Sequence, residues 1–96
     1  MPTLQFEHAI KDFEIWKAAF DRDPIDRAAL GVRRHRIYRP VGEPGYVVGE
    51  LEFDTAAEAQ ACAGALRELW ASRQAAPALL GAPQVRIVEV IEDHGY

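Results

Sequence analysis

The chain has 96 residues, of which 49% are apolar and 27% charged, and its 15 acidic and 11 basic residues give a net charge of −4. This composition is that of a globular protein, and its acidic balance argues against general binding to nucleic-acid phosphates. The apolar stretches are only strand-sized and no basic segment precedes an apolar one, so we expect no membrane span and no signal peptide. We therefore expect a single cytoplasmic domain over residues 1–96, whose thin core favours pairing with a second copy.

The first third of the sequence predicts a strand, a helix and a short second helical segment. Residues 3–10 alternate apolar and polar side chains, which is typical of a half-buried strand. Asp12 is placed to cap a helix that bends near Arg22. Pro24 then begins a second helical segment, and Gly31 is placed to end it. The first helix carries a stripe of aromatic residues typical of a core-facing surface, namely Phe13, Trp16 and Phe20.

The middle of the sequence predicts a β-hairpin. Residues 33–39 and 46–53 have strand patterns, and the prolines and glycines between them favour a turn. Opposite charges match if the strands pair as Tyr38–Val48, Arg36–Glu50 and Arg34–Glu52. This register predicts a salt-bridged strand, with an anion site built from its arginines as the alternative. His35 and Ile37 then fall on the opposite face, toward the helices, where His35 can be a core histidine.

The last part of the sequence predicts a long helix, a loop and a final strand. Thr55 and Glu58 fit a capping box that starts a helix over residues 56–72, loosened at Gly64. Cys62 is the one cysteine of the chain, so it cannot form an internal disulfide. Its position among alanines suits the role of a small, buried apolar side chain. Two prolines and a glycine predict a loop over 75–84 with a helical turn near Leu79, before a strand over 85–92 whose facing is ambiguous.

The predicted order, β-α-β-β-α-β, indicates an α+β, ferredoxin-like fold with an antiparallel sheet and both helices on one face. The other face of the sheet is then bare, and it must be solvated, covered by a partner or used to bind a ligand. Its mixture of polar and apolar side chains suits the inside of a two-sheet assembly better than a fully wet surface. A homodimer follows from this arrangement.

The chain lacks the strong sequence signals of nucleotide, serine-hydrolase and metal chemistry. His8, His35 and His94 are its only histidines, and they form none of the close pairs typical of metal ligands. No glycine-rich phosphate loop and no Gly-x-Ser-x-Gly elbow occurs. One constellation remains that works without a metal or cofactor. His8 or His35 would accept a proton, while Arg36 and Tyr38 stabilise a developing oxyanion.

Three segments resemble the dimeric α+β barrel superfamily, and in particular small antibiotic biosynthesis monooxygenase-like proteins. They are the Asp-Phe-Glu-Ile-Trp-Lys-Ala-Ala-Phe-Asp run at 12–21, Gly31-Val32 ahead of the strand at 35–39, and Leu-Glu-Phe-Asp-Thr at 51–55. The resemblance implies that two ferredoxin-like subunits join their open sheets into a barrel with a cleft for a small aromatic or apolar molecule. The asparagine-containing set of the haem-degrading members cannot be carried over, because this chain has no asparagine.

We therefore predict a small-molecule-binding dimeric barrel, in the form of a cofactor-independent monooxygenase or cyclase for an aromatic or polycyclic compound. The alternative is a non-catalytic ligand-sensing or interaction module. A cavity of a few hundred Å³ lined by His35 and Tyr38 would favour the first, and a barrel interior filled by arginine–glutamate pairs would favour the second. The predicted site has His35, Tyr38 and Arg36 as catalytic residues, His8, Glu50 and Trp70 as substrate-binding residues, and neither metal nor cofactor.

Overall fold

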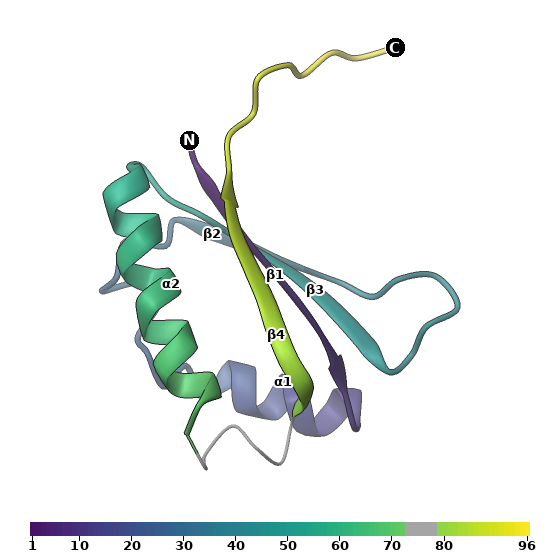
Figure 1. The fold of residues 1–96 in the computed structure, drawn as a ribbon. Coiled ribbons are helices and arrows are strands. Elements are labelled where there is room, and N and C mark those ends of the chain that lie inside the picture. The colour runs from purple at the N-terminus through teal and green to yellow at the C-terminus, as the bar shows by residue number, and fades with distance from the viewer. Residues whose placement is uncertain (73–78) are drawn as a thin grey trace.

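The computed structural model describes residues 1–72 and 79–96 (Figure 1). It describes the side chains of all these residues except 79–81. Its strands form one four-stranded antiparallel sheet in the order β2-β3-β1-β4. The predicted fold class, α+β with the ferredoxin-like order β-α-β-β-α-β, is confirmed. The elements are β1 (Thr3–Ile10), α1 (Phe13–Asp21), β2 (Arg34–Tyr38), β3 (Tyr46–Glu52), α2 (Ala56–Trp70) and β4 (Leu79–Val88).

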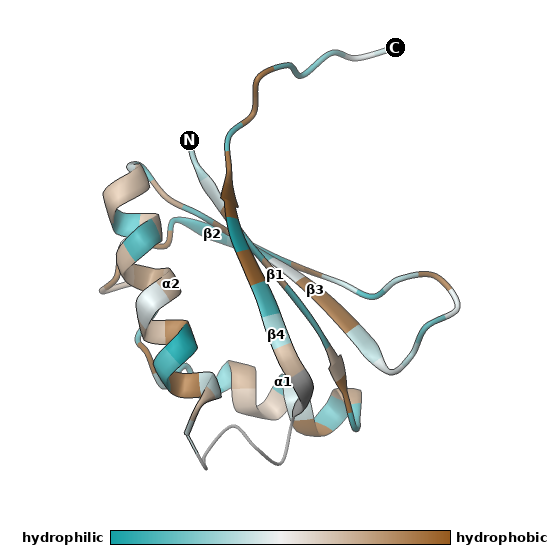
Figure 2. Cartoon of the chain, viewed as in Figure 1, coloured by the Kyte–Doolittle hydropathy of each residue, from teal (hydrophilic) through white to brown (hydrophobic). Residues whose placement is uncertain are grey.

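The core lies between the sheet and the two helices, and the alternation of β1 determines which side chains enter it. Leu4, Phe6, His8 and Ile10 are buried, whereas the intervening residues of β1 are half-buried on the other face. Buried residues of both helices pack in the same cluster, so the helices cover one face and leave the other open. Figure 2 shows the matching alternation of hydropathy along β4. The helical members of the core are Trp16, Ala59, Cys62, Ala63 and Leu66.

Both helices begin where their capping residues predict. The Asp12 side chain accepts a hydrogen bond from the backbone N–H of Ile15 at 3.0 Å. Thr55 and Glu58 form the reciprocal capping box at the start of α2. Helix α2 continues without interruption through Gly64, so the loosening expected there does not occur. It ends at Trp70, two residues before the predicted end.

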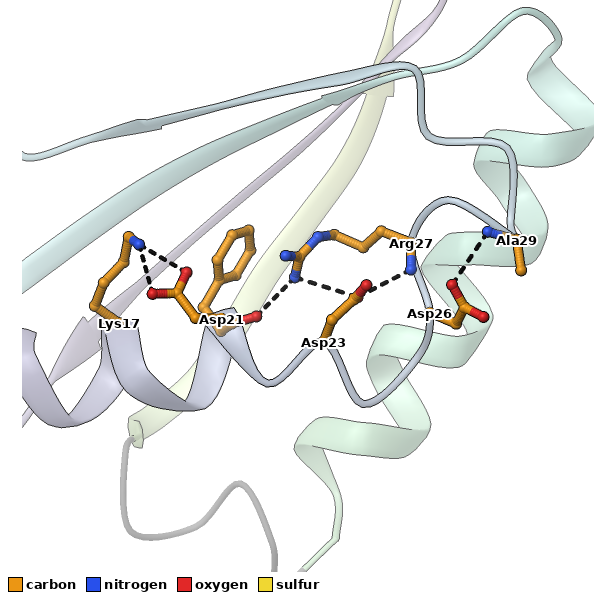
Figure 3. A network of polar contacts seen from close by, with 7 residues as sticks. Lys17, Asp21, Asp23, Asp26, Arg27 and Ala29 are labelled. Atoms are coloured by element: carbon orange, nitrogen blue, oxygen red, sulfur yellow. Dashed lines mark hydrogen bonds and ion pairs between the residues drawn. The ribbon is translucent and has the colours of Figure 1, made fainter.

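The predicted second helical segment after α1 is wrong, because residues 24–31 form turns. Asp23 and Asp26 have positive φ angles of 52° and 57°, which a right-handed helix does not permit. Their side chains stabilise the turns, because the Asp23 carboxylate accepts a hydrogen bond from the backbone N–H of Arg27 and the Asp26 carboxylate accepts one from that of Ala29 (Figure 3). Gly31, at φ 96°, ends the segment as expected.

The predicted bounds of the final strand are also wrong, since β4 begins at Leu79 and ends at Val88. Residues 75–78 of the predicted loop lie outside the described residues. β4 is an edge strand, and its pairing with β1 is interrupted by a register shift opposite His8. Pro83 lies at this irregularity, where the backbone N–H that proline lacks is not needed for pairing. Its facing is resolved as well. Val85 and Ile87 pack on the core, while Arg86 lies opposite Gln5 on the open face.

Cys62 is fully buried in α2, as its sequence context predicts. Burial raises the pKa of the Cys62 thiol to about 11. At pH 8 roughly one thiol in a thousand is then ionised, so we expect Ellman's reagent to react with the folded protein at least a hundredfold more slowly than with the urea-unfolded protein. Equal rates in the two states would show that α2 does not protect this thiol.

No helix in the described ranges is both long and apolar enough to cross a membrane.

Candidate functional site

A cavity lies between the covered face of the sheet and the helices, at the end where α2 finishes and α1 leads into the turns. The volume open to the centre of a water-sized molecule is about 70 Å³, enough for several waters. Its walls are mainly aromatic and aliphatic, with two arginines at the rim. The residues that line it are Phe6, His8, Trp16, Ala19, Phe20, Arg22, Pro24, Ile25, Arg27, Leu51, Leu66, Leu69 and Trp70.

His8 is the buried polar side chain of this cavity, with 3% of its surface exposed. Three aromatic rings surround its imidazole. The ring centroids of Phe6 and Trp16 each lie 6.0 Å from that of His8, and Trp70 lies 6.2 Å away. Phe6 comes from the same strand, Trp16 from α1 and Trp70 from the last residue of α2. Both tryptophans of the chain therefore border one titratable group.

The hydrogen bond of His8 determines which ring nitrogen is free to act. Nδ1 lies 3.1 Å from the carbonyl oxygen of Ala9, which can only accept, so Nδ1 carries the proton of the neutral ring. Burial lowers the pKa of His8, and the bond to Ala9 offsets part of that effect. His8 is therefore neutral at pH 7, and its Nε2 has a lone pair with no protein partner among the described residues. This nitrogen can accept a proton from a bound molecule.

Arg27 is held rigidly at the rim of the cavity. Its guanidinium lies 3.8 Å from the centroid of the Phe20 ring and donates to the Phe20 carbonyl oxygen at 2.9 Å. The same group forms an ion pair with the Asp23 carboxylate at 3.5 Å. Figure 3 marks this contact with a dashed line. Phe20 in turn stacks on Trp16 at 5.1 Å. Cation–π and ion-pair contacts thus fix one wall of the cavity.

The open face of the sheet carries a separate polar network that crosses all four strands. Arg86 of β4 donates to Gln5 of β1 at 3.2 Å, and Gln5 donates to Glu50 of β3 at 3.0 Å. The hydroxyl of Tyr38 on β2 donates to the other oxygen of Glu50 at 2.6 Å. These two donors lower the pKa of Glu50. A second, more polar hollow of about 370 Å³ borders this network at Gln5, Glu7, Gln84 and Arg86.

The predicted register of the hairpin is confirmed, but the predicted salt bridges are not. Arg36 lies opposite Glu50 and Arg34 opposite Glu52. In the part of the chain that the structure describes, no ion pair within 4.0 Å joins either couple. Both oxygens of Glu50 are instead occupied by Tyr38 and Gln5. The arginines at 34 and 36 are therefore left at the edge of the sheet without a salt bridge to a described residue.

The structure brings together two of the six predicted site residues at the buried cavity, His8 and Trp70. Arg36, Tyr38 and Glu50 lie on the open face. His35 lies on the covered face, exposed and with its ring 5.2 Å from that of Phe20. The predicted catalytic set of His35, Tyr38 and Arg36 is thus divided between the two faces of this chain. Neither His35 nor Tyr38 lines either cavity described above.

Several residues of the cavity were not predicted as functional. Trp16 and Phe20 have the periodicity of a core stripe and were therefore interpreted only as core residues. The structure shows that they also line the cavity. Arg22 fell at the predicted bend and Arg27 in the predicted second helical segment, and their spacing gave no sign that both line the same cavity. No cluster of three or more potential metal ligands occurs within residues 1–72 and 79–96.

Comparison with known proteins finds no matching family model and no match among curated proteins. Solved structures do match. A candidate antibiotic biosynthesis monooxygenase from Nitrosomonas europaea is 17% identical, with 96% of this chain and 100% of that one covered and a TM-score of 0.70. A mutant of SnoaB, a cofactor-independent oxygenase from Streptomyces nogalater, is 15% identical, with 96% and 94% covered and a TM-score of 0.70.

A dimeric ferredoxin-like protein from an uncultured marine organism is 13% identical, with 97% of this chain and 98% of that one covered and a TM-score of 0.59. At these identities the likeness concerns the fold, and it extends over nearly the full length of each chain. The predicted superfamily resemblance is confirmed at this level. The chain has the fold shared by antibiotic biosynthesis monooxygenase-like and dimeric ferredoxin-like proteins.

Proposed function

We propose that this protein binds a planar aromatic molecule in the cavity beside His8 and oxidises it with dioxygen, without a cofactor. The observation that carries the proposal is a buried imidazole, neutral at pH 7, enclosed by Phe6, Trp16 and Trp70. Aromatic walls favour stacking with a planar ligand, and one convergent polar group fixes its orientation. The fold shared with a cofactor-independent oxygenase supports the same chemistry.

The chemical role of His8 follows from its free nitrogen. Nε2 takes the proton of a weakly acidic phenol or of an activated CH₂ group, and the resulting anion is electron-rich enough to react with dioxygen. Arg22 and Arg27 at the rim face the negative charge that develops on the bound molecule. For a hydroxylated anthrone, the CH₂ carbon becomes a carbonyl while dioxygen supplies its oxygen and the second oxygen atom leaves as water.

The cavity must widen to take such a ligand, since about 70 Å³ holds only several waters. Half-buried Trp70, at the very end of α2, is the wall best placed to move. In addition, we propose a homodimer in which two copies pack their open sheet faces together. Dimeric ferredoxin-like neighbours and the half-buried polar network of Gln5 and Glu50 support this assembly.

Ligand binding can be followed directly, because both tryptophans line the cavity. We expect 1-naphthol to quench their fluorescence, and Trp70→Leu to raise its dissociation constant at least tenfold by removing a stacking surface. Val41→Ala, which shortens an exposed apolar side chain in the hairpin turn, should leave the constant unchanged. Equal affinity of the Trp70→Leu and wild-type proteins would place the ligand elsewhere.

Turnover is tested separately with a hydroxylated anthrone in an oxygen electrode. His8→Gln should reduce oxygen uptake about a hundredfold or more while retaining naphthol affinity within a few fold. Glu68→Gln, on the exposed side of α2, is the matched control. Oxygen uptake by His35→Gln tests whether the exposed His35 takes part in the reaction. Naphthol binding without any oxygen uptake would favour the ligand-sensing module over the oxygenase.

A further inference from the structure

The cavity beside His8 carries charge of one sign only. Arg22 and Arg27 line it and are permanently charged, whereas no aspartate or glutamate of the described residues does so. His8 is neutral at pH 7, because burial lowers its pKa. The chain as a whole is acidic, with a net charge of −4. A positive rim on an acidic protein attracts anionic ligands and disfavours cationic ones.

The acidic residues on either side of Arg22 are paired with other bases. Asp21 accepts two hydrogen bonds from Lys17, at 2.7 and 2.8 Å, and Asp23 forms its ion pair with Arg27 (Figure 3). Arg22 has no ion pair with a described residue. The charges that neighbour the rim therefore pair off and leave the Arg22 guanidinium uncompensated.

Other negative groups near the end of α1 are bonded within the protein. The Asp26 carboxylate accepts from the backbone N–H of Ala29 at 3.3 Å and does not line the cavity. The Phe20 carbonyl oxygen accepts from Arg27 at 2.9 Å and from the backbone N–H of Asp23 at 3.1 Å. Free carbonyl groups at a helix C-terminus repel an anion. This bonding weakens that repulsion where an anion on Arg22 would lie.

We propose that the ligand of this cavity is an aromatic carboxylate, and that Arg22 binds its carboxylate at the rim while the ring lies between the aromatic walls. The inference deepens the proposed function and rests on it. One uncompensated guanidinium matches one negative charge, and its planar fork donates two parallel hydrogen bonds to the two oxygens of a carboxylate. A phosphate monoester, with up to two charges and three acceptor oxygens, needs more donors than this rim offers.

Burial determines which end of the ligand enters the cavity. Arg22 is exposed, whereas His8 has only 3% of its surface exposed. A carboxylate at Arg22 keeps part of its hydration, but beside His8 it would lose that hydration among aromatic rings without a cation to compensate. The apolar ring gains free energy from the same burial. The carboxylate therefore selects the ligand at the rim, and the reacting end faces His8.

Three ligands with the same naphthalene ring test the charge preference by isothermal titration calorimetry at pH 7.5. 1-Naphthoate carries one negative charge, 1-naphthamide carries none, and 1-naphthyl phosphate carries close to two. We expect naphthoate to bind about fivefold or more tightly than naphthamide in 20 mM NaCl. In 500 mM NaCl the preference should fall to about twofold or less, because salt screens a contact with an exposed side chain.

A pair of arginine variants assigns the preference to one side chain. Arg22→Gln should leave naphthoate and naphthamide with roughly equal affinities, because glutamine keeps a polar side chain without the charge. Arg67→Gln removes an exposed arginine of α2 that does not line the cavity, and it should retain the wild-type preference. Far-UV circular dichroism should show both variants folded.

The outcomes separate this inference from the function on which it rests. Equal binding of naphthoate and naphthamide to the wild type would overturn the inference, and if Trp70→Leu weakens both, ligand binding in the cavity still stands. A preference that survives Arg22→Gln, or naphthyl phosphate binding more tightly than naphthoate, would also overturn the inference. A charge preference that disappears in Arg22→Gln supports it, even where a hydroxylated anthrone gives no oxygen uptake and the proposed oxidation fails.

Discussion

Replacing Gly49 with alanine is expected to destabilise the protein by about 2 kcal/mol or more, because no space exists for a methyl group there. A Cβ at this position would lie within 2.1–2.3 Å of three atoms of the Phe6 ring, which covers Gly49 from the neighbouring strand. Phe6 would have to turn away, and it is also a wall of the cavity beside His8. Urea unfolding should show the loss of stability, and naphthol affinity should fall with it.

Gly64 provides the matched control for this change. It lies within α2, and a Cβ there would meet nothing within 4 Å. Gly64→Ala should therefore stabilise the protein by roughly 0.5–1 kcal/mol through the better helix propensity of alanine. If Gly49→Ala behaved like Gly64→Ala, Phe6 would not occupy the place assigned to it.

Acidification should destabilise the protein below about pH 6.5, chiefly through His8. The folded state holds the pKa of His8 below that of the unfolded chain, since burial disfavours the imidazolium. Between these two values the unfolded chain binds more protons, so the free energy of unfolding falls as the pH falls. The slope from one such group is at most about 1.4 kcal/mol per pH unit.

Urea titrations between pH 5 and 8 on the wild type and on His8→Phe measure this contribution. The plot of unfolding free energy against pH should lose the part of its slope that comes from His8. The stability of His8→Phe, taken relative to the wild type, should therefore be higher at pH 5 than at pH 7.5. Val41→Ala alters an exposed apolar side chain that does not titrate and should retain the wild-type slope. A wild-type slope in His8→Phe would mean that His8 ionises in the folded protein as easily as in the unfolded chain.

Sequence patterns predict this fold well where a feature depends on interactions between residues that are close in the sequence. The period of two in β1 separates Gln5 and Glu7 from the core. Matching the charges of the hairpin predicts its register correctly, although the matched charges do not form salt bridges. The capping residues locate both helix starts. The start of β4 was missed because Pro83 indicates a loop, and only the register shift on β1 shows why a proline is accepted there.

The site was less predictable, since it depends on contacts between distant segments. His8 and Trp70 were named from the sequence, yet only the packing of α2 on β1 places them beside one another. His35 was grouped with Arg36 and Tyr38 by chemical role, as a proton acceptor beside two oxyanion-stabilising groups, although the strand pattern already placed His35 on the opposite face. Alternation in a strand sends sequence neighbours to opposite faces, and a catalytic role for these three residues stays a prediction.

The position of β1 in the sheet also affects how the chain is made. Of the four strands of this sheet, β1 is synthesised first, but it lies between β3 and β4, which are synthesised third and fourth. The edge of β1 that pairs with β4 stays unpaired until residues 79–88 have been synthesised. The strand β1 carries the apolar core residues Leu4, Phe6 and Ile10. Nascent chains that stop before β4 therefore present an apolar, unpaired strand and are the species most prone to aggregate.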